Sequence, residues 1–183
     1  GTAELSVYEL LGAQSSFANK GLYIEPITVL RVEDRNGNVI IDLKLKMNQA
    51  MDPNSAYLML ELMKGVVSGA RNPWAPSQWY GTAARLRSSA YDYAGLRTPI
   101  AGKTGTTNGA TDGWFVGLTP DLTTAVWVGA DDRGIRFRNM RWGQGARMAM
   151  PIFGYYMNKV YEDKSIDISK GDFEAPEGFD PSL

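Results

Sequence analysis

The chain has 183 residues and a net charge of −1 at pH 7; hydrophobic residues make up 44% of it and charged residues 21%. These values predict one folded domain with a sizeable core, and they argue against a general attraction to nucleic acid or to an anionic membrane. The absence of cysteine and histidine excludes disulfides, thiolate catalysis, Cys- or His-ligated metals and a Ser-His-Asp triad.

The first segment with a clear pattern is a helix. Ser6 and Glu9 have the spacing of a capping box, in which each side chain accepts a hydrogen bond from the other residue's backbone N–H. Apolar residues on one helical face follow as far as Ala18. Gly21, which can adopt a positive φ, marks the end of this helix.

A β-hairpin is expected next. The segments Ile27–Glu33 and Asn38–Asp42 are rich in residues that favour strands, and they flank the sequence Asp-Arg-Asn-Gly, which is a strong turn signal. A second helix should begin at Asp52-Pro53, an N-cap followed by proline at the first helical position, and end at Gly69. Its apolar face assigns Met59 and Met63 to the core.

Residues 70–97 show no clear periodicity, and we expect them to be irregular. They contain a basic turn, Gly81–Arg87. Trp74, Trp79 and Tyr80 are assigned to core packing, with the lining of a cleft as the alternative.

Three strands should follow, at Thr98–Thr106, Gly113–Leu118 and Leu122–Ala130, and a final helix at Arg147–Asp163. The short connections between the strands imply antiparallel neighbours. We therefore expect an α+β fold, an antiparallel sheet with packed helices, in a domain of residues 1–163. The acidic, proline- and glycine-containing residues 164–183 are expected to form an extended tail.

An arginine-rich segment separates the last expected strand from the last helix. We expect a solvated loop there, because Asp131, Asp132 and the net charge argue against nucleic-acid binding. An approach surface for anionic glycan strands is the alternative. The segment contains Arg133, Arg136, Arg138, Arg141 and Arg147, interleaved with Phe137 and Trp142.

Lys103 is preceded by Gly102 and followed by Thr-Gly-Thr-Thr. A phosphate-binding P-loop needs a glycine five positions before Gly102, but that position is Arg97; moreover Pro99 removes an N–H, and a strand follows where a helix is required. Recognition of a small carboxylate beside a reactive serine fits better. The ammonium raises the local potential, the hydroxyls donate, and Gly105 leaves room for a substrate backbone along the strand edge.

Four blocks of the chain resemble the transpeptidase domain of class A penicillin-binding proteins, in the order in which that family has them. The last block holds the Lys-Thr-Gly element of penicillin-recognising serine enzymes. The resemblance spans most of the chain and implies the C-terminal portion of a serine transpeptidase/β-lactamase-like fold. The blocks are GTAELSVYELLGAQSSFANKG, YIEPITVLRVEDRNGNVI, MDPNSAYLMLELMKGVVSGA and AGKTGTTNGATDGWFVGLTPDLTTAVWVGADD.

The resemblance implies roles for the residues of this strand. Lys103 would act catalytically, through its charge and in the proton network. Thr104 and Thr106 would bind the substrate carboxylate, and the Thr106 backbone N–H would be one of two oxyanion donors. Gly105 and Thr107 complete the predicted substrate-binding residues, although Thr107 also suits a plain polar loop.

The motifs that would complete the chemistry are not found in the chain. No serine is followed by lysine three positions later, and no S-x-N sequence occurs. In the family both motifs precede the first helix expected here. The chain is therefore expected to need the missing N-terminal half of the domain and to be inactive alone.

The resemblance also implies partners and a location. Peptidoglycan stem peptides and β-lactams would bind the intact domain, with no metal or organic cofactor, no nucleic acid and no membrane contact from this chain. The parent protein would be extracytoplasmic and membrane-anchored, with a glycosyltransferase domain upstream. The rival interpretations are a class B transpeptidase or a carboxypeptidase of the same superfamily, and a non-catalytic anion- or peptide-binding module or sensor.

Overall fold

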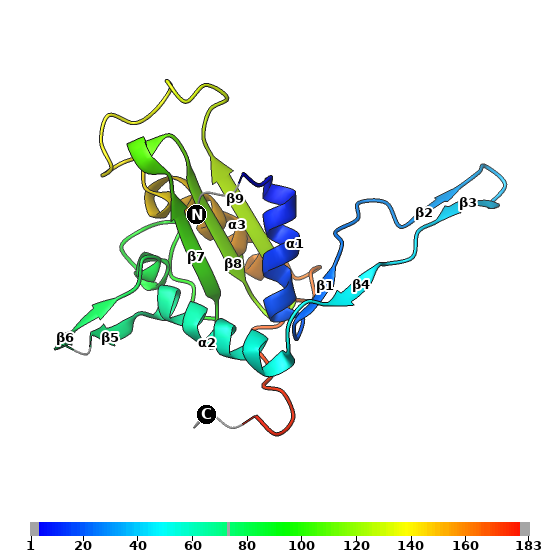
Figure 1. The fold of residues 1–183 in the computed structure, drawn as a ribbon, viewed down its shortest axis with the longest axis horizontal. Helices are drawn as coiled ribbons and strands as arrows, with labels where there is room; N and C mark the ends of the chain where they lie inside the picture. Colours follow the sequence, from blue (N-terminus) through cyan, green and yellow to red (C-terminus); the bar gives the residue numbers. More distant parts are fainter. Residues whose placement is uncertain (1–3, 73, 180–183) are drawn as a thin grey trace.

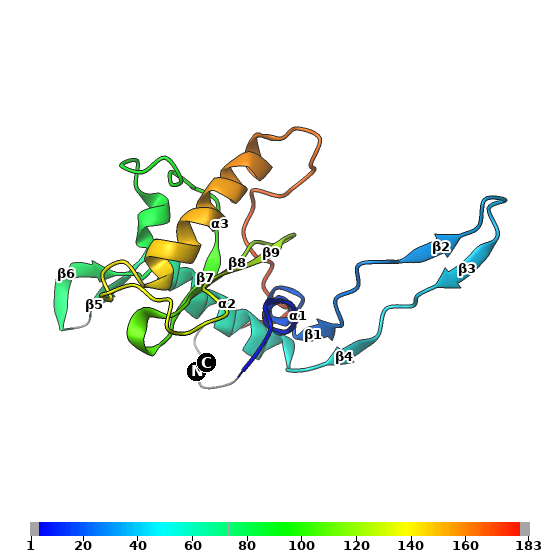
Figure 2. The same cartoon turned by 90° about the horizontal axis from the view of Figure 1, so that it is seen from above.

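The computed structural model describes residues 4–72 and 74–179, without the side chains of residue 72 and residues 75–79. Its centre is a three-stranded antiparallel sheet in the order β7-β8-β9 (Figure 1). One helix covers one face of the sheet and two helices pack on the other side, as seen in Figure 2. The α+β class and the antiparallel arrangement are as predicted. The bounds are β7 (Ala101–Thr106), β8 (Gly113–Leu118), β9 (Thr123–Val128), α1 (Val7–Ala18), α2 (Pro53–Ser68) and α3 (Gly145–Glu162).

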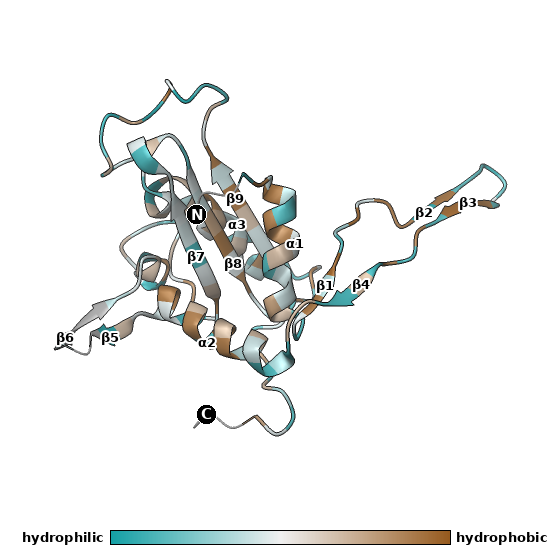
Figure 3. Cartoon of the chain, viewed as in Figure 1, coloured by the Kyte–Doolittle hydropathy of each residue, from teal (hydrophilic) through white to brown (hydrophobic). Residues whose placement is uncertain are grey.

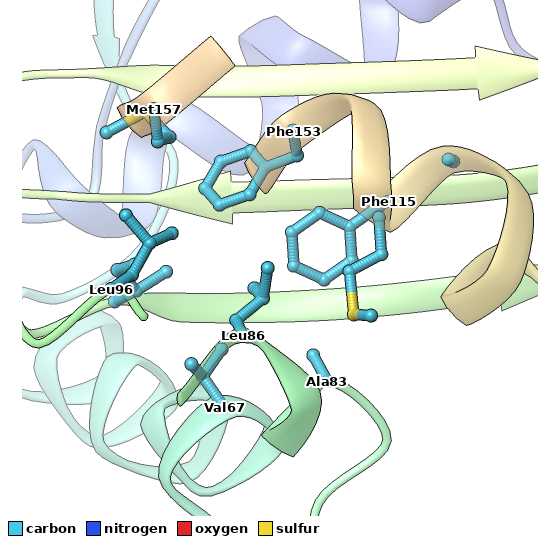
Figure 4. Packing of buried hydrophobic residues seen from close by; sticks show 10 residues of the cluster. Val67, Ala83, Leu86, Leu96, Phe115, Phe153 and Met157 are labelled. Atoms are coloured by element: carbon cyan, nitrogen blue, oxygen red, sulfur yellow. The ribbon is translucent and has the colours of Figure 1, made fainter. Parts of the chain in front are cut away.

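The alternation of side chains along β8 builds a core on each face of the sheet. Phe115 is fully buried against Phe153 of α3, with the ring centroids 4.8 Å apart (Figure 4). Val116, the next residue, faces the opposite way and packs in a second cluster with Leu60 of α2. Gly117 permits this arrangement, because a Cβ there would collide with the Phe153 ring. The sheet is thus held between two helical layers.

The helix signals read from the sequence are confirmed. Ser6 and Glu9 form the predicted capping box, and Gly21 has φ of +80°. Asp52 caps α2 by accepting from the backbone N–H groups of Asn54 and Ser55. α3 begins two residues earlier than predicted and accommodates Pro151 within its second turn.

The predicted hairpin is present but forms only the end of a longer arm. Its strands β2 (Arg31–Glu33) and β3 (Val39–Asp42) are shorter than expected and pair in antiparallel fashion. A second pair at the base, β1 (Leu22–Ile24) and β4 (Met47–Gln49), was not predicted. The arm projects from the body and carries apolar residues in brown in Figure 3. The interpretation of residues 27–30 as strand was wrong: the chain bends at residues 28 and 30, and the regular pairing with β3 begins only at Arg31.

Three assignments around α2 and the following segment were also wrong. Met59 is 40% exposed, because it lies at the edge of the apolar stripe whose centre is Leu60 and Met63. The segment expected to be irregular contains two strands, β5 (Ala70–Asn72) and β6 (Ala75–Tyr80), which pair in antiparallel fashion. Trp74 at its tip is 90% exposed and Tyr80 is 60% exposed, so neither is a core residue. The side chain of Trp79 lies outside the described residues.

After α3, the described residues 163–179 return to the body without forming a helix or strand. Phe173 is 7% exposed and joins the cluster on the α1 and α2 side. Lys64 of α2 holds Asp172 at 2.9 Å, and the rings of Tyr57 and Phe179 meet edge to face at 4.8 Å. The division into a domain of residues 1–163 and a tail stays a prediction. Among the described residues, no helix combines the length and the apolar character that crossing a membrane requires.

Candidate active-site wall

Four of the five predicted site residues, Lys103 to Thr106, lie on β7, which is an edge strand of the sheet, and Thr107 follows it directly. Successive side chains of a strand point to opposite faces. Lys103 and Gly105 therefore share the face of Ala101, which packs in the cluster with α2. Thr104 and Thr106 share the other face, toward α3. The strand thus presents a cation on one side and two hydroxyls on the other, with its free edge between them.

One groove brings all five predicted residues together. It has a volume of about 370 Å³ and lies between β7 and the start of α1. Among the described residues that line this groove, Lys103 has the only charged side chain. The groove is lined by Leu5, Leu10, Gln14, Lys103, Thr104, Gly105, Thr106, Thr107, Trp114 and Val116.

Lys103 is exposed and keeps its positive charge uncompensated. Its Nζ donates to the backbone carbonyl of Thr104 at 2.7 Å. It makes no ion pair with any carboxylate that the structure describes. Two of its three ammonium protons remain available for a ligand. An anion entering the groove would therefore meet an attractive potential.

Thr104 is held by a hydroxyl from a distant part of the chain. Its Oγ1 lies 2.8 Å from Oγ1 of Thr82. Thr82 is positioned by the turn that leads from β6 into the short helix η1 (Ala84–Arg87), where the Ala83 N–H donates to Val66 O at 2.9 Å. Gly81 allows this close approach, because a Cβ there would lie 2.7 Å from Val66 O. One of the two threonine hydroxyls donates its proton to the other, so the second hydroxyl proton remains available for a ligand.

Thr106 is held by the first residue of α3. The Gly145 N–H donates to Thr106 Oγ1 at 3.0 Å, and Gln144 supplies no side-chain cap of its own. Thr106 thus caps α3 from the neighbouring strand, satisfying one of the unpaired N–H groups of a helix start. Because its oxygen accepts this bond, the Thr106 hydroxyl proton is left to donate to a ligand. The positive end of the α3 dipole adds to the attraction for an anion.

Thr107 has a structural task in the turn after β7. Its Oγ1 lies 2.7 Å from Oγ1 of Thr111 and accepts from the Asp112 N–H at 3.0 Å. These bonds close the loop that contains the short helix η2 (Asn108–Ala110). The side chain of Thr107 is therefore occupied by its own turn, and its predicted part in binding a substrate stays a prediction.

Sequence reasoning missed Thr82 and Gln14. Thr82 lies 22 positions before its partner; the glycine that precedes it was the one local signal for a close backbone approach. Gln14 of α1 lines the groove, and its Oε1 is buried without a hydrogen-bond partner. A polar residue on an otherwise apolar helical face was the available signal. No group of three or more metal-ligating side chains occurs in the part of the chain that the structure describes.

Chemically, this arrangement is a wall suited to a carboxylate. It combines an ammonium, hydroxyl donors on one strand and the positive end of a helix dipole. Gly105 is tightly packed against the next strand, because a Cβ there would lie 2.9 Å from Trp114 Cβ, whereas the outer edge of β7 is open.

A comparison with family models matches residues 1–134 to the penicillin binding protein transpeptidase domain. The chain belongs to this family. The predicted resemblance to class A penicillin-binding proteins is confirmed by similarity to the penicillin-binding proteins 1A of Neisseria gonorrhoeae (35% identical, 97% of this chain, 20% of the relative) and Clostridium novyi strain NT (31%, 94% and 17%). The chain thus spans about a fifth of the length of the curated relatives it matches.

Solved structures agree with this assignment. Penicillin-binding protein 1A from Haemophilus influenzae superimposes with a TM-score of 0.74 at 25% identity, over 90% of this chain and 27% of that one. For the penicillin-binding protein PonA1 from Mycobacterium tuberculosis, the TM-score is 0.60 at 22% identity, over 93% of this chain and 44% of that one. For an imipenem acyl-enzyme complex of penicillin-binding protein A from M. tuberculosis, the TM-score is 0.60 at 19% identity, over 86% of this chain and 32% of that one. The last two similarities establish the fold alone.

Proposed function

We propose that this chain forms the carboxylate-binding wall of a D,D-transpeptidase that cross-links peptidoglycan stem peptides through an acyl-serine. The observation that carries the proposal is the groove in which Lys103, Thr104 and Thr106 meet along an open strand edge. In a transpeptidase domain, this edge would take the carboxyl-terminal end of the donor peptide as an added strand. β-Lactams would occupy the same place.

The donors divide into two tasks. The hydroxyls of Thr104 and Thr106 bind the terminal carboxylate, and Lys103 supports the serine and the proton transfers electrostatically. The backbone of Thr106 supplies an oxyanion donor. Support for this comes from the strand: the Thr107 N–H donates inward to Asp112 O at 3.2 Å, so the preceding N–H of Thr106 points to the open edge.

The serine and its base would come from residues outside this chain. No S-x-x-K sequence is present here, and acyl transfer requires both groups. We therefore expect the chain alone to be inactive. The parent would act outside the cytoplasmic membrane, where its substrate lies, held by an anchor and carrying a glycosyltransferase domain elsewhere in its sequence. The alternative is a non-catalytic binding module of the same fold, whose parent protein would have no S-x-x-K sequence elsewhere either.

Intact-mass spectrometry after benzylpenicillin treatment tests the proposal. The full-length parent should gain one penicilloyl adduct, and the present chain none. Lys103→Gln in the parent should slow acylation by about 10²-fold or more. Thr106→Val should slow it by about tenfold, with Thr106→Ser nearer to the wild type. The matched control is Lys44→Gln, which removes an exposed lysine from the arm.

Each outcome has a distinct meaning. If the parent is not acylated, the chain belongs to a binding module. If the present chain is acylated, one of its own serines is reactive and the assignment of the nucleophile is wrong. If Lys103→Gln and Lys44→Gln behave alike, the catalytic role of Lys103 is refuted.

A further inference from the structure

The loop between β9 and α3 has an unusual charge for this chain. Residues 131–144 contain four arginines and two aspartates, a net charge of +2, whereas the whole chain has −1. The remaining residues therefore sum to −3. Every residue from 131 to 142 is exposed, including Ile135, Phe137 and Trp142 among the arginines. The loop, which we call the arginine loop (residues 131–144), thus presents a basic and apolar surface.

The arginines of this loop have no carboxylate partner, although Arg141 stacks over the Trp142 ring, with its Cζ 5.4 Å from the ring centroid. Among the described residues, none of them forms an ion pair. Asp132, the nearest acid, turns its carboxylate to its own backbone, where Oδ1 accepts from the Gly134 N–H at 2.7 Å. Although the whole chain is net negative, the guanidinium groups of this loop face solvent without a carboxylate partner among the described residues. Such groups recognise carboxylates by bidentate hydrogen bonds.

The arginine loop is attached to the turn that follows the Lys-Thr-Gly strand. The Phe137 N–H donates to Ala110 O at 3.2 Å. Gly143 packs directly on Ala110, whose Cα would lie 3.0 Å from an added Cβ. A Cβ on Gly109 would likewise lie 3.0 Å from Arg136 Nη1. Figure 1 shows the loop, in yellow, arching beside this turn at one end of β7. The loop and the proposed carboxylate-binding strand are thus neighbours.

A cavity lies between the arginine loop and this turn. Its volume is about 540 Å³, within the range of small-molecule and peptide sites. Arg136 and Arg138 supply its charges, and Phe137 and Met140 supply apolar surface. None of these residues belongs to the groove beside Lys103. The site is therefore separate from the proposed donor site but adjacent to it.

We propose that Arg136 and Arg138 bind a carboxylate of the second stem peptide, the one whose amine accepts the acyl group. This rests on the proposed function, because cross-linking needs two peptides at once and the edge of β7 takes the first. A peptide with free carboxylates and short apolar side chains matches a surface of guanidinium and apolar groups. The loop then raises the local concentration of the acceptor beside the acyl-enzyme.

The test compares two half-reactions in the full-length parent. Arg136→Gln/Arg138→Gln is the variant, and Arg31→Gln/Arg35→Gln on the arm is the control that removes the same charge from exposed positions. Acylation by benzylpenicillin reports the donor side and correct folding. Transfer of a thioester donor to a soluble stem tripeptide, against hydrolysis, reports the acceptor side. We expect the variant to lower transfer about five- to tenfold while acylation stays within about twofold. The control should change neither.

The outcomes separate this inference from the function it rests on. An unacylated wild-type parent refutes the proposed function. Acylation with unchanged transfer in the Arg136→Gln/Arg138→Gln variant refutes the acceptor site alone, and so does an equal loss of transfer in the control. Equal loss of acylation and transfer in that variant also overturns it, because the loop would then support the donor side. A second readout is the binding of the tripeptide to the present chain, measured by NMR. Polyphosphate should displace the tripeptide only weakly. Strong displacement would indicate a general polyanion-binding surface instead.

Discussion

The packing of α3 on β7 makes a sharp prediction for Gly145→Ala. An added Cβ would lie 3.0 Å from the Trp114 backbone nitrogen and still closer to the carbonyl oxygens of Gly105 and Trp114. All three atoms belong to the backbone of the central sheet. A flexible side chain could turn aside, but these atoms cannot. The first turn of α3 must therefore move away from the strand.

The cost has two parts. Overpacking of a well-packed site costs about 1–3 kcal/mol. Moving the helix also lengthens the 3.0 Å bond from the Gly145 N–H to Thr106 Oγ1, which adds about 1 kcal/mol. The free energy of unfolding should fall by about 2–4 kcal/mol in total. The total stability of a domain is about 5–15 kcal/mol, so the variant should still fold.

Urea unfolding followed by circular dichroism measures this change, and Gly65→Ala is the matched control. A Cβ on Gly65, in the last turn of α2, would meet only Ala70 Cβ at 3.8 Å. Replacing glycine by alanine inside a helix gains about 0.5–1 kcal/mol, so the control should be slightly more stable than the wild type. If Gly145→Ala unfolds within about 0.5 kcal/mol of the wild type, the close approach of α3 to β7 is wrong.

Three further predictions concern other contacts of the fold. Phe173→Ala should lower the free energy of unfolding by about 2–4 kcal/mol in the same assay, because Phe173 is 7% exposed within the core. Thr82→Val in the parent should slow benzylpenicillin acylation about tenfold, since Thr104 loses its hydroxyl partner at 2.8 Å, whereas Thr82→Ser should restore it. The Ser55 and Asn54 backbone N–H groups lower the pKa of Asp52. The ionised carboxylate should therefore stabilise the folded chain above about pH 4, and this stabilisation should be lost as the pH falls and Asp52 is protonated. Asp52→Ser keeps the cap without a titrating group and should flatten the acid side of a stability–pH curve.

Short-range signals were the reliable part of the sequence. The capping box at Ser6, the cap at Asp52 and the bounds of β8 are all decided by residues within a few positions of one another. The base of the arm could not be predicted in this way. Its register joins Leu22 to Gln49, and the three-residue strands carry no alternating pattern of their own. Pairing across that separation is decided by tertiary packing.

In the candidate site, too, local features could be predicted and distant contacts could not. The residues of the Lys-Thr-Gly strand could be named from the motif, because the chemistry of an ammonium beside hydroxyls is local. The partners that hold those hydroxyls could not, since Thr82 lies 22 positions before Thr104 and Gly145 lies 39 positions after Thr106. Gly145 was missed because its contribution is the absence of a side chain: α3 can approach β7 this closely only if that position is glycine.

The alternation of β7 explains why a single strand can serve both parts of the proposed chemistry. A period of two places Lys103 toward α1 and both threonines toward α3, so the cation and the hydroxyl donors never compete for the same neighbour. Each face then uses its own support: the apolar wall of α1 beside the lysine, and Gly145 with Thr82 behind the hydroxyls. A one-residue slip of β7 against β8 would exchange the two faces and bury the ammonium against the α3 core. The register of β7 against β8, which pairs all six residues from Ala101 to Thr106, opposes that slip. Ala101 and Gly102 are small residues at positions where the cores on the two faces of the sheet leave little room, so a slip would bring larger side chains there.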